Sequence, residues 1–331
     1  MPTTNKVPGI DDILDAAKQL DGALFRTPLL ESERLNARAG ARIFLKCEMC
    51  QPVGAFKLRG AWNMISRLAE EQIKKGVVAY SSGNHAQAVA WAARRRGVEA
   101  TIVMPNNAPS VKIENTKALG ANIILYDRAT EDREAISSEL AKQTGAIIVP
   151  PYDHPQIIAG QGTVGFEAMA QMADLGIIPD LFIVPCSGGG LIAGCAIAVK
   201  EAQPDTKVFA VEPENFDDTC RSLRIGKRVI NAAGGGTICD ALMVETPGEI
   251  TFEINRKTID GGEVVTDAEV RAAVRIALLD TSIAVEPSGA VGLAAVLAGR
   301  LTVPAGNICV VLSGGNIDET LLAAIISGQE N

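Results

Sequence analysis

The chain has 331 residues, a length that typically folds as two domains or as one domain with an insertion. Hydrophobic residues make up 47% and charged residues 21%, which argues against a disordered or fibrous chain. The net charge of -8 disfavours a surface that binds nucleic acid or an anionic membrane. No leader-like segment opens the chain, and no run approaches the roughly 18 apolar residues of a membrane span. We therefore expect a soluble, cytoplasmic protein.

Seven cysteines are scattered through apolar segments, which is typical of reduced core thiols and not of a secreted disulfide framework. Cys47 and Cys50 form a C-x-x-C pair after the strand-like residues 43–45. A redox or zinc role would need a helix start or a second ligand pair, and the histidines are limited to His85 and His154. Packing in the core is the favoured interpretation, with a redox role as the alternative.

From Lys75 onward, short apolar runs alternate with longer segments whose apolar residues recur at helical spacing. The runs predict strands at residues 77–80, 101–104, 122–126, 147–149, 181–184, 208–211 and 308–312. The helical segments include residues 85–95, 110–119, 131–143 and 167–173. Strand and helix in alternation predict an α/β fold with open, twisted, mostly parallel sheets flanked by helices.

The domain boundaries have to be inferred indirectly, because no repeat, low-complexity tract or long linker marks them. The strand–helix run from about Lys75 to Asp153 could form a compact inserted unit. We therefore expect a small α/β domain at residues 76–153, inserted into a large domain made of residues 1–75 and 154–331.

Three predicted strands are followed by small, flexible residues instead of ordinary loops. These segments are Ser81-Ser82-Gly83-Asn84-His85, Cys186-Ser187-Gly188-Gly189-Gly190-Leu191 and Ser313-Gly314-Gly315-Asn316. Ligands bind beyond the carboxyl ends of parallel strands, where glycines and helix N-termini favour anions. Tight turning would explain one such segment. Three of them, with hydroxyl and amide side chains, predict a small-molecule site for several anionic groups.

The type of phosphate site can be narrowed from the same residues. No G-x-x-x-x-G-K-[ST] motif occurs, which argues against a P-loop nucleotide site. Gly188, Gly190 and Ala193 match the relaxed dinucleotide pattern, and Glu212 ends the next strand about 20 residues later. Three adjacent glycines better suit a cup around one terminal phosphate. A nicotinamide dinucleotide stays an alternative.

Lys57 lies near a predicted helix start, in the segment Gly54-Ala55-Phe56-Lys57-Leu58-Arg59-Gly60-Ala61. The positive end of the helix dipole disfavours a charged amine there and would assist a nucleophilic one. A solvated surface lysine is the alternative that spacing alone leaves open.

With these segments the chain resembles the fold-type II pyridoxal-phosphate enzymes, in the serine/threonine dehydratase and serine racemase branch. The resemblance runs from about Phe25 to the C-terminus, which implies a two-domain fold of that type. It rests on five motifs in the family's order, namely the Lys57 segment, the run at Ser81, Ala159-Gly160-Gln161-Gly162-Thr163, the run at Gly188 and the segment at Ser313. Two positions depart from the family: Ala55 stands where serine is common, and Asp240-Ala241 stands where Asp-Gly is usual.

The resemblance implies which residues bind the cofactor, pyridoxal 5'-phosphate. Lys57 would hold it as a Schiff base and then act as the base on the substrate Cα. Phe56 would pack against the ring, Asn84 would hydrogen-bond its hydroxyl, and Ser313 would face the pyridine nitrogen. The main-chain N–H groups of Gly188, Gly189, Gly190 and Leu191 would bind the phosphate. The substrate carboxylate would lie on Ser81, Asn84 and His85.

The implied activity is that of an L-threonine/L-serine dehydratase, which eliminates the β-hydroxyl and gives a 2-oxo acid and ammonia. Ser313 carries a neutral hydroxyl, so it cannot hold the pyridine nitrogen protonated as a carboxylate would, which favours elimination over slower outcomes. A β-replacement synthase and a cofactor-binding protein without turnover are less favoured alternatives, because the Ser81–His85 run, Lys57 and Ser313 are all present. The resemblance also implies the short, catabolic form and a homo-oligomer, specifically a dimer.

Two residues bear on the choice of substrate and reaction. Ser82 occupies the position from which racemases of this family return a proton opposite the lysine; a helix N-cap is its alternative role. Arg133 aligns with an arginine that reaches the substrate region in serine racemase. A guanidinium there could bind a second carboxylate, which would suit 3-hydroxyaspartate; a helix-surface arginine is the alternative. Hydroxyaspartate dehydratase and serine racemase are therefore the runner-up functions.

Residues 211–218 resemble the family's divalent-cation loop. Glu212, Asp218 and the main-chain carbonyl of Phe216 would supply the hard oxygen ligands that Mg²⁺ or Ca²⁺ prefers. A solvated acidic turn is the alternative. We expect any bound ion to be structural or activating, because the chemistry belongs to the cofactor.

Overall fold

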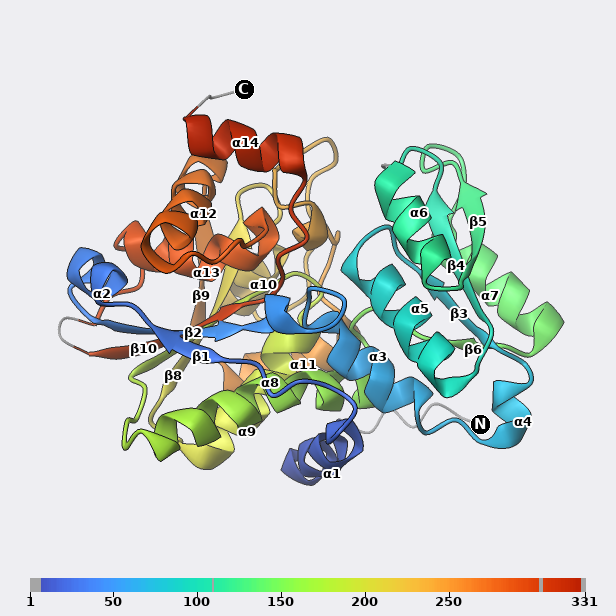
Figure 1. Cartoon of the computed structure of the whole chain (residues 1–331), viewed down its shortest axis with the longest axis horizontal. Helices are drawn as coiled ribbons and strands as arrows, with labels where there is room; N and C mark the ends of the chain where they lie inside the picture. Colours follow the sequence, from blue (N-terminus) through green and yellow to red (C-terminus); the bar gives the residue numbers. More distant parts are fainter. Residues whose placement is uncertain (1–6, 109, 304–305, 329–331) are drawn as a thin grey trace.

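Two sheets organise the chain (Figure 1). The computed structural model describes residues 7–108, 110–303 and 306–328. The six-stranded sheet has the order β1-β2-β10-β7-β8-β9, with β1 at Leu29–Glu31, β2 at Arg42–Cys47, β10 at Asn307–Leu312, β7 at Leu181–Pro185, β8 at Lys207–Pro213 and β9 at Gly261–Val265. The four-stranded sheet has the order β5-β4-β3-β6, with β5 at Asn122–Tyr126, β4 at Ala100–Pro105, β3 at Val77–Tyr80 and β6 at Ile147–Ile148. In both sheets every pairing except that of β1 with β2 is parallel, which confirms the predicted class.

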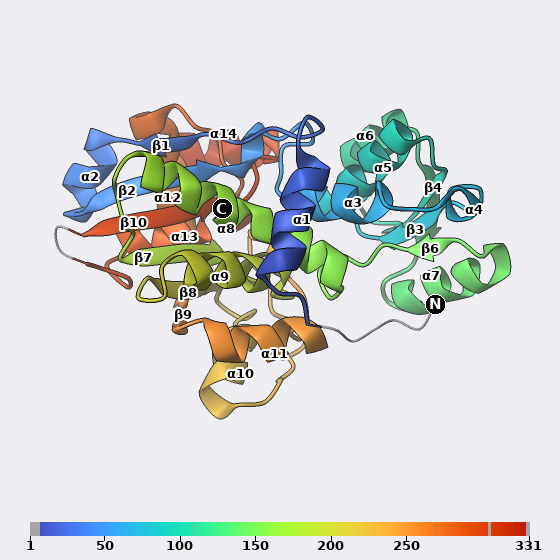
Figure 2. The same ribbon diagram turned by 90° about the horizontal axis from the view of Figure 1, so that it is seen from below.

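Helices cover both faces of the larger sheet (Figures 1 and 2). On one side lie α2 at Glu33–Ala39, α12 at Asp267–Thr281, α13 at Pro287–Leu297 and α14 at Glu319–Ser327. On the other side lie α8 at Pro155–Asp174 and α9 at Gly190–Ala202, with α1 at Ile10–Leu20 and α11 at Glu249–Thr258 packed outside them. The helix α10 at Asp218–Ile225 contacts β8 and β9. Two short 3₁₀ segments, η1 at Glu48–Cys50 and η2 at Asp240–Leu242, complete this part.

The central strands are apolar on both faces because helices bury both. Along β7, Leu181 and Ile183 join the core beneath α12 and α13, whereas Phe182 and Val184 join the core beneath α8 and α9. This two-sided burial explains why the strands are near-continuous apolar runs, which made them visible in the sequence.

The smaller sheet has its own apolar core. It is accompanied by α5 at Asn84–Arg96, α6 at Ser110–Ala118 and α7 at Arg133–Thr144. The same core includes Leu58, Ala61 and Ile65 from α3 at Lys57–Ile65, and α4 at Glu70–Ile73 follows α3 directly. The predicted boundaries of the inserted domain, at residues 76 and 153, stay a prediction.

Close helix packing explains one glycine-rich motif. The Ala159–Thr163 motif lies inside α8, not in a loop. A Cβ on Gly160 would lie 2.6 Å from the Cα of Gly60 in α3, and a Cβ on Gly194 in α9 would lie 2.3 Å from the carbonyl oxygen of Ile158. The glycines therefore let three helix backbones approach each other behind the site.

Two of the predicted elements need correction. The helix predicted at residues 167–173 begins at Pro155, because proline at its first turn and glycines within it conceal a continuous helix. The segment after β10 is not a strand-to-helix junction, since α14 begins only at Glu319. Several elements were not predicted, among them α1, β9 and α10 to α14. No helix among the residues that the structure describes is long and apolar enough to cross a membrane.

Candidate active site

One cavity lies at the carboxyl ends of strands from both sheets, and it receives the three small-residue segments. The twelve residues predicted to contact the cofactor or the substrate all line it, namely Phe56, Lys57, Ser81, Ser82, Asn84, His85, Arg133, Gly188, Gly189, Gly190, Leu191 and Ser313. The segment at Ser81 follows β3 of the smaller sheet, whereas Gly188 and Ser313 follow β7 and β10 of the larger one. The cavity is therefore built between two sheets.

Lys57 is the first residue of α3, as predicted. Its Nζ donates a hydrogen bond to the main-chain oxygen of Pro151 at 2.8 Å and lies 5.2 Å from the centre of the Phe56 ring. Burial lowers the pKa of Lys57 to about 8. The main-chain N–H of Phe56 donates to the carbonyl of Ser313, which ties the start of α3 to the end of β10. Lys57 is thus a half-buried residue whose partly neutral amine lines the cavity, and the interpretation as a solvated surface lysine is wrong.

The glycine run forms a cup at the start of α9. The first main-chain bond of this helix runs from Ala193 N to Gly189 O, so the N–H groups of Gly190 and Leu191 have no helical acceptor. Gly189 has φ of 89°, a conformation that favours glycine. A Cβ on Gly188 would lie 2.5 Å from the ring of Tyr152. The cup therefore needs glycine for two separate reasons, and its N–H groups suit an anion.

The surroundings of Glu212 argue against the nicotinamide dinucleotide alternative. This side chain is fully buried, and its two oxygens accept the main-chain N–H groups of Thr219 and Cys220 at 3.2 and 2.8 Å. It is therefore not available for the ribose hydroxyls that a dinucleotide would present at this position.

The loop before α5 presents two serines to the cavity. The N-cap of α5 is Gly83, so the N-cap role considered for Ser82 is wrong. Ser81 Oγ accepts the N–H of Gly83 at 3.3 Å, and Ser82 Oγ accepts a hydrogen bond from Arg128 Nη2 at 3.4 Å. Both hydroxyls thus remain beside the cavity, at the positive end of α5.

His85 is buried with a fixed tautomer. Its Nε2 bonds the carbonyl oxygen of Val149 at 2.9 Å, which requires a hydrogen on that nitrogen. Burial, together with the charge of Lys57, lowers the pKa of His85 to about 3. The ring is therefore neutral, and its buried Nδ1 carries a lone pair without a partner among the described residues. This side chain has no donor to offer a carboxylate, so a contribution by His85 has to come from its main-chain N–H.

Three cationic side chains from the segments that accompany the smaller sheet line the cavity. Lys112 pairs with Asp240 at 2.5 Å. Arg133 begins α7, lines the cavity and stacks its guanidinium 5.6 Å from the centre of the Tyr80 ring; its role toward a second carboxylate stays a prediction. Arg128 contacts Ser82 only through the hydrogen bond above. Within the described part of the chain, neither guanidinium pairs with a carboxylate.

Sequence reasoning missed Arg128, Lys112, Tyr152 and Glu286 as cavity residues. Glu286 gave a signal, because a single charged residue directly after the apolar run at 283–285 and before Pro287 is typical of a buried polar contact. Tyr152 and Arg128 gave none, since they come to the cavity only through the packing of the two sheets. Two positions depart from the family. Ala55 forms a β-bridge with Gly314, and Ala241 lines the cavity.

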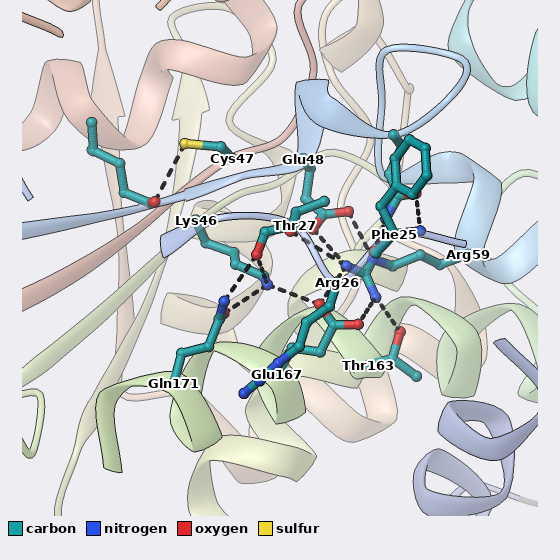
Figure 3. A network of polar contacts seen from close by, with 12 residues as sticks. Phe25, Arg26, Thr27, Lys46, Cys47, Glu48, Arg59, Thr163, Glu167 and Gln171 are labelled. Carbon is teal, nitrogen blue, oxygen red and sulfur yellow. Dashed lines mark hydrogen bonds and ion pairs between the residues drawn. The ribbon is translucent and has the colours of Figure 1, made fainter. Parts of the chain in front are cut away.

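A buried ionic network surrounds Arg59, which lies two residues after Lys57 in α3 (Figure 3). Arg59, the third residue of α3, donates hydrogen bonds to Glu48 at 2.7 Å and to Glu167 at 2.7 Å. Lys46 donates to the second oxygen of Glu167 at 2.8 Å. Although burial opposes it, the two cations lower the pKa of Glu167. Two cations thus balance two carboxylates, and together they tie α3 to β2, η1 and α8.

The predicted cation ligands lie away from the cavity. Glu212 and Asp218 are both buried, and burial together with their mutual repulsion raises the pKa of Glu212. Asp218 Oδ1 accepts from Asn231 Nδ2 at 2.6 Å, but its Oδ2 is buried without a partner in the described part. Phe216 is also buried. No group of three or more His, Cys, Asp or Glu side chains suited to a metal occurs among the described residues.

The C-x-x-C pair has no reactive thiolate. Cys47 is buried, and burial raises its pKa to about 12. Cys50 is exposed, and burial of its sulfur still raises its pKa. The seven cysteines are all free thiols. Six of them are buried, as expected for core packing, whereas Cys50 is exposed, so the core-packing prediction is wrong for Cys50.

Comparison with known proteins finds relatives that align with almost the whole chain. The family described as "Pyridoxal-phosphate dependent enzyme" matches residues 20–314. An L-threo-3-hydroxyaspartate ammonia-lyase of Saccharomyces cerevisiae is 42% identical over 98% of each chain. An L-threonine ammonia-lyase of Thermotoga maritima is 41% identical over 96% of this chain and 78% of its own length. The solved structure of maize serine racemase aligns with a TM-score of 0.90 and 40% identity over 98% of each chain.

The geometry and these similarities agree. A lysine in the cavity, a glycine cup for one phosphate and a polar loop between two parallel sheets are the parts that a pyridoxal-phosphate site requires, and the matched region contains all of them. The chain belongs to the pyridoxal-phosphate dependent enzymes.

Proposed function

We propose that this enzyme is an ammonia-lyase that removes the β-hydroxyl and the amino group of a hydroxy amino acid, with L-threonine and L-serine as its first substrates. The observation that carries the proposal is the single cavity shared by the Lys57 amine and the Gly188–Leu191 cup. Relatives with this activity support it.

The residues of the cavity fit pyridoxal phosphate. The phosphate suits the free N–H groups of Gly190 and Leu191, where Tyr152 leaves no space for a Cβ on Gly188. The amine of Lys57 suits the aldehyde group, and Phe56, Asn84 and Ser313 line the same cavity, where they would contact the ring. When bound, the cofactor supplies a ring that takes up the electron pair left by loss of the Cα proton.

The protein's own contribution is binding and proton movement. Lys57 takes the proton from the substrate Cα, since its lowered pKa provides a neutral amine near physiological pH. Ser81 and the N-terminus of α5 bind the substrate carboxylate through hydroxyl and N–H donors. Ser313 presents a hydroxyl and no charge to the cofactor ring.

A second candidate substrate is 3-hydroxyaspartate. Arg128 and Arg133 line the cavity without carboxylate partners in the described chain, and an additional carboxylate on the substrate would pair with them. Two relatives are hydroxyaspartate ammonia-lyases. Racemisation of serine is a third candidate, supported by the serine racemase relatives and by the Ser82 hydroxyl at the cavity.

The deciding experiment is release of oxo acid from a panel of substrates. Purified enzyme loaded with pyridoxal phosphate is given L-threonine, L-serine and each stereoisomer of 3-hydroxyaspartate, with Lys57→Ala as the inactive control. Preference for threonine or serine would support the first substrate assignment, and preference for a hydroxyaspartate would replace it with the second. Absence of oxo acid from every substrate would contradict the lyase.

We further propose that a divalent cation, Mg²⁺ or Ca²⁺, binds at Glu212, Asp218 and the main-chain oxygen of Phe216. The support is the unpartnered, buried Oδ2 of Asp218 beside a second buried carboxylate, because a cation would offset the cost of burying both charges. The dimer and the cytoplasmic location also stay predictions; sedimentation velocity and cell fractionation would test them.

A further inference from the structure

Glu286 is a buried carboxyl group at the cavity that the reaction outlined above does not use. It precedes α13, and its main-chain N–H donates to the carbonyl of Gly314 at 3.1 Å. Its residue exposure is 4%, and its Oε1 accepts a hydrogen bond from Asn84 Nδ2 at 2.7 Å. A Cβ on Gly314 would lie 2.4 Å from this oxygen. The carboxyl is therefore held tightly against the amide of Asn84.

The hydrogen bonds around Asn84 have only one consistent direction. The main-chain oxygen of Val53 can only accept, so Asn316 must direct its Nδ2 toward it, at 2.9 Å. The same Nδ2 donates to Asn84 Oδ1 at 2.8 Å. Asn84 must therefore direct its Nδ2 toward Glu286, which accepts. One hydrogen of Asn84 Nδ2 is used in this way, and the other is left for the cavity.

The charged and polar groups that face Glu286 come from four other segments. Asp240 from η2 opposes the carboxylate, whereas Lys112 from α6 favours it. Asn84 from α5 and the main-chain N–H of Asn316 donate to it. Burial, reinforced by Asp240, raises the pKa of Glu286 to about 7. Both the neutral and the charged form keep an oxygen that accepts from Asn84, so the bond persists through this titration.

We propose that Glu286 is a positioning residue for the cofactor: with Asn316 it locks the Asn84 amide in one orientation, so that Asn84 offers the cavity an N–H donor. This inference rests on the proposed function, in which Asn84 contacts the ring hydroxyl of pyridoxal phosphate. Without Glu286 the Asn84 Nδ2 loses its acceptor, and the contact with Asn316 is the one remaining side-chain hydrogen bond between described residues that fixes the amide, so the amide is held less firmly. Glu286 acts here through the oxygen that accepts a hydrogen bond from Asn84, and its negative charge is not required.

The test compares two substitutions that separate these roles. Glu286→Gln keeps an oxygen for Asn84 and removes the charge, whereas Glu286→Ala removes both. The dissociation constant of pyridoxal phosphate is measured on the apoprotein of each variant by absorbance titration, without substrate. We expect Gln to stay within about threefold of the parent and Ala to bind about tenfold more weakly, which is the loss of roughly one hydrogen bond.

A control separates positioning from a general loss of stability. Thr266→Ala removes the N-cap of α12, whose hydroxyl accepts the main-chain N–H of Glu269, and Thr266 does not line the cavity. This variant should melt at a lower temperature and bind the cofactor as the parent does.

The absorbance of the bound cofactor between pH 6 and 8 gives a second signature: a change near pH 7 in the parent should be absent in Glu286→Gln.

The outcomes distinguish this inference from the proposed function. If Glu286→Ala binds the cofactor as tightly as the parent, or if Gln is weakened as much as Ala, the positioning role is wrong while the lyase stands. If Lys57→Ala leaves the absorbance of the bound cofactor unchanged in the otherwise native chain, the cofactor site itself is wrong.

Discussion

The side-chain nitrogen of Lys57 lies 2.8 Å from the main-chain oxygen of Pro151. Lys57 begins α3, and Pro151 lies in the chain that runs from the smaller sheet toward α8. A neutral oxygen stabilises the charged amine less than a carboxylate would, so burial dominates and the pKa falls to about 8. The amine is thereby kept reactive before any ligand arrives.

The first prediction follows from this pKa. Below about pH 8 the Lys57 amine is mostly charged and unreactive, and above it mostly neutral. The rate at which the apoprotein takes up pyridoxal phosphate covalently should therefore rise about tenfold from pH 6 to pH 7 and level off above pH 8. Stopped-flow absorbance measures this rate, with Lys57→Arg as the control that does not load. A rate independent of pH from 6 to 9 would contradict the assignment.

The second prediction concerns substrate choice in the cavity. Arg128→Met and Arg133→Met should each lower kcat/KM for 3-hydroxyaspartate by about tenfold or more, because each removes a charge-assisted partner of the second carboxylate. For L-serine, which lacks that group, the change should be less than about threefold. Arg94→Met, an exposed substitution in the same unit that does not line the cavity, is the matched control. Equal losses on both substrates would show that the arginines serve some other purpose.

The third prediction concerns the ionic network around Arg59. Arg59→Met leaves Glu48 and Glu167 buried without their main partner, which should lower the free energy of unfolding by about 3–5 kcal/mol. Arg26→Met breaks only an exposed pair with Asp174 and should cost less than about 1 kcal/mol. Urea denaturation of both variants makes the comparison. A small effect at Arg59 would mean that water or a shifted side chain replaces the guanidinium.

The fourth prediction concerns the cation. Adding Ca²⁺ or Mg²⁺ to chelator-treated enzyme should raise its melting temperature, because a ligand that binds only the folded state stabilises it. Asp218→Asn should abolish most of that rise, whereas Asp217→Asn, at a half-buried neighbour that pairs with Arg221, should not. Identical melting curves with chelator and with either ion would rule out this cation site.

The glycine cup offers a fifth prediction. Gly188→Ala places a Cβ against the ring of Tyr152, so the loop must move and the affinity for pyridoxal phosphate should fall by about tenfold or more. Truncating the ring in the double variant Gly188→Ala/Tyr152→Ala should restore part of the lost affinity. If the single variant binds normally, the cup tolerates a side chain and the close packing is not needed for binding.

The local sequence was sufficient to determine much of this protein. Continuous apolar runs identified the parallel strands, because helices bury those strands on both faces and no alternation is needed. Segments of serine, glycine and asparagine after three strands identified residues that line the cavity, and we propose that they bind anions, since phosphate recognition requires main-chain N–H groups that small residues leave open. Lys57 was singled out by its predicted helix start, and its role was inferred from the family resemblance.

The tertiary structure alone decided how these parts meet. Asn84 and Glu286 are 202 residues apart, and only the approach of the smaller sheet to the larger one brings them within hydrogen-bond distance. Tyr152 reaches Gly188, and Arg128 reaches Ser82, for the same reason. Only part of α8 was predicted from the sequence. Its glycines allow the backbones of α3 and α9 to approach closely, and they interrupt the apolar periodicity by which a helix is predicted. Local patterns report the surroundings of one segment; contacts between distant segments depend on packing that no single segment encodes.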